Sequence, residues 1–168
     1  MHSAFFLTLF LSAISALAMA LPIGIHGRAT GARQFSAFTI ANGVGGNALA
    51  EAKAAFPGTA STLSAAQTSA FNADAHCSVL AEQAFLDDGA IASSNKASNS
   101  ISVGLFKNKV LKIYGTMLVL QAEIAQNGGT ATSDQQAQLD DLTTKLAANV
   151  KVDQTNAGIT STSADFTC

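Results

Sequence analysis

The chain has 168 residues, with 9 lysines and arginines against 11 aspartates and glutamates and a formal net charge of −2. Such a length is typical of one domain, and a charged fraction of only 12% excludes charged disordered tails and coiled-coil rods. The weakly acidic balance gives no reason to expect nucleic acid as a partner, because nucleic-acid binding needs a basic face.

Residues 1–20 are predicted to be a signal peptide. An apolar run from Ala4 to Leu17 precedes Ala18-Met19-Ala20, a small-x-small pattern that signal peptidase accepts. A membrane anchor is the disfavoured alternative, because the run is shorter than the ~20 residues of a membrane span and lacks a basic stop-transfer flank. We therefore expect cleavage between Ala20 and Leu21 and a secreted, extracellular protein without stable membrane anchoring.

Residues 21–34 are predicted to be a flexible N-terminal arm, because Pro22 and three glycines interrupt any regular structure. The sequence does not decide whether a protease trims this arm after Arg28 or Arg33. The next residues, 35–40, fit either a short extended piece or an aromatic cap on the end of a helical bundle.

The first two helices are predicted from their start and stop signals. A short alanine-rich helix over 48–56 is stopped by Pro57-Gly58. A second, longer helix begins near Ser64, which forms a capping-box pattern with Gln67, and ends at Asp87-Asp88-Gly89.

The third helix, predicted over 101–126, has the strongest periodicity in the chain. Apolar residues alternate at spacings of three and four over three heptads, which predicts a buried core seam of Val103, Phe106, Val110, Ile113, Met117, Leu120 and Ile124. Further apolar positions widen this stripe, so we expect the helix to be central. Lys107, Lys109 and Lys112 are assigned to its outer, solvated face, with contact to anionic groups as the alternative.

A fourth helix is predicted to begin at Ser133, with Gln136 completing a capping box, and to end near 156–158. The chain is therefore predicted to be all-α, with residues 35–158 forming a small antiparallel helical bundle of three long helices plus a short N-terminal helix. Residues 159–168 are predicted to be a Ser/Thr-rich tail on the surface that ends in Cys168. Whether this tail is O-glycosylated stays open.

Cys77 and Cys168 are the only two cysteines in the sequence. An oxidising compartment favours a disulfide between them, and the chain-entropy model assigns such a long loop roughly 4–5 kcal/mol as an upper figure. Two free thiols, or a link to another chain, are the alternatives.

Three patterns have a weak chemical signal. The run 43–48 matches the Gly-x-Gly-x-x-Ala form of a dinucleotide fingerprint, but no acid follows about 20 residues on. His76 and Cys77 are neighbours that point about 100° apart on a helix. The acid pairs Asp87-Asp88 and Asp140-Asp141 are expected to be solvated rather than to form a glycosidase pair. The sequence therefore assigns no catalytic residue, metal ligand or cofactor.

Three stretches of the chain stand out together: 35–53, which contains Gly-Asn-Ala-x-Ala-Glu-Ala, 107–115, which begins Lys-Asn-Lys-Val-Leu-Lys, and 144–153 in the last helix. These stretches resemble segments of a group of fungal effector-like small secreted proteins. The resemblance implies secretion and a non-enzymatic role in responding to a host or a growth environment. Many members of the group lack cysteines, so the resemblance does not imply the Cys77–Cys168 disulfide.

The leading prediction is a secreted, non-enzymatic, effector-like small protein that acts by interaction with a host or the environment, in fungal growth or stress response. Its partner is an unknown protein or a small apolar ligand. The first alternative is an extracellular carrier of small apolar or aromatic ligands in a cavity between helices. The second is a small secreted hydrolase, ranked last because no nucleophile, base and orienting group can be assembled.

Overall fold

The structure is a computed structural model that describes residues 33–92 and 97–168. The predicted signal peptide, its cleavage site between Ala20 and Leu21, and the arm up to residue 32 lie outside the described residues. The described residues fold into four α-helices, one 3-10 helix and a small two-stranded sheet: η1 Phe35–Ala37, β1 Gly43–Val44, α1 Ala48–Ala55, α2 Ala65–Asp87, α3 Ser100–Gln126, α4 Ser133–Thr155 and β2 Thr160–Ser161.

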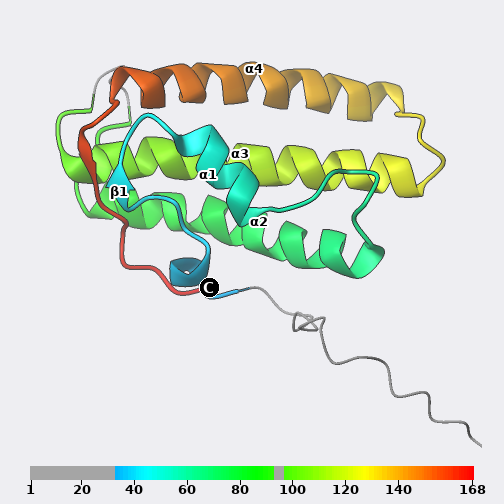
Figure 1. The fold of residues 1–168 in the computed structure, drawn as a ribbon, viewed down its shortest axis with the longest axis horizontal. Coiled ribbons are helices and arrows are strands. Elements are labelled where there is room, and N and C mark those ends of the chain that lie inside the picture. The colour runs from blue at the N-terminus through cyan, green and yellow to red at the C-terminus, as the bar shows by residue number, and fades with distance from the viewer. Residues whose placement is uncertain (1–32, 93–96) are drawn as a thin grey trace, which may run out of the picture.

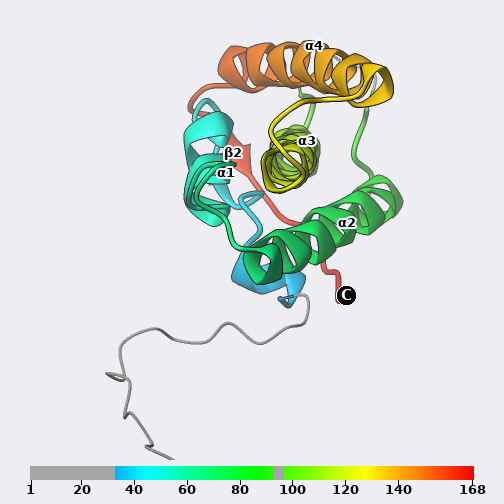
Figure 2. The same cartoon turned by 90° about the vertical axis from the view of Figure 1, so that its right-hand side faces the viewer.

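Helix α3 lies at the centre of the molecule. Figure 2 looks along α3 and shows α1, α2 and α4 arranged around it. Figure 1 shows that α4 lies beside α3 and runs in the opposite direction. The apolar stripe of α3 is wide enough to pack against several neighbours at once, which is why this helix is central.

Six of the seven predicted seam residues are buried, and Met117 is half-buried. Met117 lies next to α4, where the Thr143 hydroxyl approaches its sulfur at 3.9 Å. Helix α4 covers α3 only loosely, because the residues of its inner face are all half-buried: Leu139, Leu142, Leu146 and Val150.

The N-termini of α2 and α4 show how far local sequence signals determine where a helix begins. Ser64 caps α2 and forms the predicted capping box with Gln67. The corresponding prediction for α4 is wrong by one residue, because Thr132 is the N-cap and pairs with Gln135. Two overlapping pairs, 132/135 and 133/136, satisfy the same pattern, so the path of the preceding turn decides which is used.

The C-terminal tail packs on the fold through the buried residues Ser161 and Ala164, while five of its ten residues remain exposed at the surface. Strand β2 pairs antiparallel with β1, with Gly43 opposite Ser161. Beyond it, Ala164 is buried and the Phe166 ring packs edge-on against Phe35, with centroids 5.9 Å apart. The fold is mostly helical, as predicted, and the small sheet is an addition that the sequence did not indicate, since two-residue strands are too short to show an alternating pattern.

The disulfide between Cys77 and Cys168 is present, as predicted. Cys77 is buried on α2, and the two Cα atoms are 5.7 Å apart, a usual separation for a disulfide. The bond fastens the last residue of the chain to the middle of α2.

Candidate functional site

Lys107 is fully buried, which contradicts its predicted place on a solvated face. Its ammonium group donates to the carbonyl oxygens of Asn42 at 2.8 Å and Val44 at 3.0 Å, and it forms an ion pair with Glu51 at 2.8 Å. Three acceptors match the three N–H groups of an ammonium, so the buried charge is well compensated. The helical phase contained the signal, because Lys107 lies four residues after Val103 and three before Val110 on the buried stripe.

A second buried charge, Asp153, holds the glycine-rich run at the start of α1. Its carboxylate accepts the backbone N–H of Gly46 and that of Ala48, both at 2.9 Å. This is the position at which a dinucleotide fingerprint would hold a phosphate. In this protein the Asp153 carboxylate itself occupies the position of the phosphate.

The glycines in this run allow the backbone before α1 to pack closely against the backbone at the end of α4. A Cβ atom at Gly45 would lie 2.5 Å from the carbonyl oxygen of Asn156, and Gly46 has a φ of +110°. The N–H of Gly45 donates to Ile159 and the N–H of Gly158 donates to Gly45. The end of α4 therefore packs directly on the glycine run.

The three stretches that carry the resemblance meet in these contacts. Lys107 joins the second stretch to the first, and Asp153 joins the third to the first. Lys107 and Asp153 of these stretches thus support the fold. Other residues of the second and third stretches are available for other contacts.

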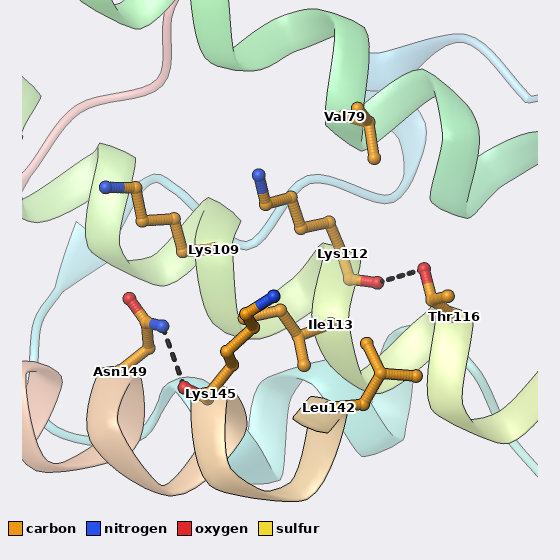
Figure 3. A pocket seen from close by; sticks show the side chains of 8 residues that line it. All are labelled: Val79, Lys109, Lys112, Ile113, Thr116, Leu142, Lys145 and Asn149. Carbon is orange, nitrogen blue, oxygen red and sulfur yellow. Dashed lines mark hydrogen bonds between the residues drawn. The ribbon is translucent and has the colours of Figure 1, made fainter. Parts of the chain in front are cut away.

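A groove between α2 and α4 opens on the part of α3 that neither helix covers (Figure 3). Its volume is about 420 Å³, and residues of all three helices line it: Val79, Lys109, Lys112, Ile113, Thr116, Leu142, Lys145 and Asn149. The other hollows described are smaller, at about 250–270 Å³. Both Lys109 and Lys112 thus belong to a groove rather than to an open helix face.

The charges around the groove form a short network. Glu82 of α2 pairs with Lys112 and, at 3.7 Å, with Lys109. Lys145 pairs with Asp141 one turn away on α4, at 2.7 Å. Lys109 also lies over the Phe106 ring, 5.4 Å from its centroid. Three ammonium groups thus face two carboxylates.

The family model of "Domain of unknown function (DUF8454)" matches residues 30–165. The chain belongs to this family. No curated protein and no solved structure matches the chain. The DUF8454 match includes the buried charges Asp74, Lys107 and Asp153, as well as every residue of the groove.

The other residues with a weak chemical signal in this DUF8454 domain make structural or local contacts. His76 is exposed on α2, whereas its neighbour Cys77 is buried in the disulfide and has no thiol available. Asp87 accepts from Gln83, and Asp140 accepts from Gln136, each within its own helix and exposed. Desolvation raises the pKa of the Tyr114 hydroxyl above its ordinary value of 10.0, so this group keeps its proton at neutral pH.

Sequence reasoning gave Arg33 no structural role, and the structure places it in a specific site. Its backbone and guanidinium donate to the buried carboxylate of Asp74, both at 2.8 Å, and its guanidinium donates to the carbonyl of Ala55. The same group lies over the Phe38 ring at 4.7 Å. The described part of the chain thus begins with an anchored residue rather than with a flexible one.

Within residues 33–92 and 97–168, no helix is long and apolar enough to span a membrane. The same residues contain no group of three or more His, Cys, Asp or Glu side chains that could hold a metal ion.

Proposed function

We propose that this protein is a secreted, non-enzymatic, effector-like small protein that binds a component of a host or of its growth environment. The proposal includes a fold in which three long helices and a short N-terminal one form a small antiparallel bundle. Support for secretion comes from the signal-peptide pattern of residues 1–20, and support for the effector-like role comes from the resemblance of three segments.

The observation that carries the binding role is the groove over α3. Its side chains include three apolar residues from three different helices. Lys107 and Asp153 are engaged inside the fold, whereas Lys109, Lys112, Ile113, Lys145 and Asn149 of the same two stretches line the groove.

The first alternative, a carrier of small apolar or aromatic ligands, is supported by the same groove. Its volume of about 420 Å³ lies within the range of roughly 300–1,000 Å³ typical of small-molecule sites. A hydrolase ranks last, because Cys77 is consumed in a disulfide and the paired acids make contacts within their own helices.

The test is a tagged chain expressed in a fungal host. We expect mass spectrometry of the culture fluid to find a mature chain that begins at Leu21. A chain that still contains residues 5–17, or that stays in the cells, would contradict secretion.

Binding is tested with the same tagged protein and a variant in which the groove is filled. Val79→Trp suits this purpose, because Val79 is 44% exposed and lines the groove without belonging to the core. We expect a partner or ligand to be retained by the wild type and lost with Val79→Trp. Equal retention by both proteins would place the binding surface elsewhere.

A further inference from the structure

The floor of the groove is apolar and is made by three helices. Val79 of α2, Ile113 of α3 and Leu142 of α4 are its apolar lining, and Figure 3 shows Ile113 and Leu142 near each other with Val79 on the opposite side, beyond Lys112. Ile113 is almost fully buried, whereas Val79 remains 44% exposed. A ligand seated in the groove would therefore remove apolar surface from water, which favours a ligand with an apolar chain or ring.

The sides of the groove are cationic. Lys109 and Lys112 share a single carboxylate, Glu82, so this cluster of α2 and α3 has one positive charge in excess. Lys145 and its partner Asp141 balance each other and are both more than half exposed. The five groups together leave one net positive charge beside the apolar floor, in a protein whose whole chain is weakly acidic.

The polar groups that are not lysines are engaged with their own helices. The Thr116 hydroxyl donates to the carbonyl of Lys112, and the Asn149 amide donates to the carbonyl of Lys145, both at 2.8 Å. The ammonium groups are different, because each has three donors and can hold a ligand oxygen while it keeps its carboxylate partner.

We infer that this groove binds a small amphipathic monoanion, an acid whose single negative charge lies at one end of an apolar chain or ring system. The apolar body lies on Val79, Ile113 and Leu142, and the anionic group lies among the lysines. A monoanion matches the single excess charge, and a volume of about 420 Å³ suits a small molecule rather than a folded partner. This inference rests on the proposed binding function and specifies its ligand class.

The test uses two fluorescent probes that differ only in the charged group. 8-Anilinonaphthalene-1-sulfonate is an amphipathic monoanion, and N-phenyl-1-naphthylamine is the same molecule without the sulfonate. Titrations with the oxidised mature protein should show tighter binding of the sulfonate than of the neutral probe. Circular dichroism of every variant verifies that its fold is retained.

Substitutions in the charge network should change sulfonate binding in opposite directions. Lys112→Gln and Lys145→Gln remove a cation and should weaken it about fivefold or more, with the neutral probe unaffected. Glu82→Gln removes the competing carboxylate and should strengthen it. Lys151→Gln, an exposed lysine on α4 outside the groove, is the matched control and should change nothing.

Two results would overturn the inference, and they differ in what they imply for the proposed function. In the first, both probes bind equally, the lysine substitutions have no effect and Val79→Trp abolishes binding. The groove would then bind a ligand, but an uncharged one. In the second, neither probe binds, or both bind equally well to Val79→Trp. The groove would then not be a small-molecule site, and the proposed binding function would lose its support.

Discussion

Replacing the buried lysine tests the interpretation that Lys107 supports the fold. In Lys107→Met a side chain of similar length keeps the packing but removes the ammonium group. The carbonyls of Asn42 and Val44 and the carboxylate of Glu51 then lose a donor at 2.8–3.0 Å.

The size of the effect follows from these contacts. Hydrogen bonds to a charged group contribute about 1.5–3 kcal/mol each, and removal of one partner of a buried ion pair costs about 3–5 kcal/mol. Glu51 is about one-third exposed, so water can hydrate its carboxylate once the lysine is gone. Methionine also avoids the cost of burying a charge. For both reasons the lower end of each energy range applies. We expect Lys107→Met to lose about 3 kcal/mol of unfolding free energy, a large fraction of a small domain's stability.

Urea unfolding followed by circular dichroism measures this loss, with Lys109→Met as the control. Lys109 lies two residues away, is 18% exposed and pairs with Glu82 at the long distance of 3.7 Å, so its removal should cost less than about 1 kcal/mol. Equal losses in the two variants, or wild-type stability of Lys107→Met, would refute the interpretation of Lys107 as a structural charge.

Three further predictions concern the ends of elements. Asp153→Ala should cost about 2–4 kcal/mol, because two backbone N–H groups lose their acceptor, and hydrogen exchange should show reduced protection at the start of α1. Cys168→Ser should lose up to about 4 kcal/mol in thermal melts and release residues 160–168 to carboxypeptidase; wild-type resistance would show that the disulfide is dispensable for the tail. Thr132→Ala should cost about 1 kcal/mol and Ser133→Ala less than about 0.5 kcal/mol, since only the former removes the cap of α4; the reverse order would restore the sequence-based cap.

The candidate site was only partly predictable from the sequence. The lysines 107, 109 and 112 stood out as a group, but the structure divides them, with one inside the core and two beside the groove. Their separation depends on how far around α3 the neighbouring helices extend. A helical wheel gives the phase of each residue but not the position of the neighbours.

The four α-helices and the starts of α1 and α2 can be read from the amino-acid sequence alone, whereas α3 and α4 each differ by one residue from the predicted start or cap. These depend on signals within about four residues, such as the Ser64–Gln67 capping box, the Pro57-Gly58 stop and the heptad spacing of α3. Three sets of contacts are visible only in the folded molecule: those of Lys107 with Asn42, of Asp153 with Gly46, and of the tail with β1. These join residues 65 to 118 positions apart, so they depend on how the completed helices pack, and no local pattern encodes that packing.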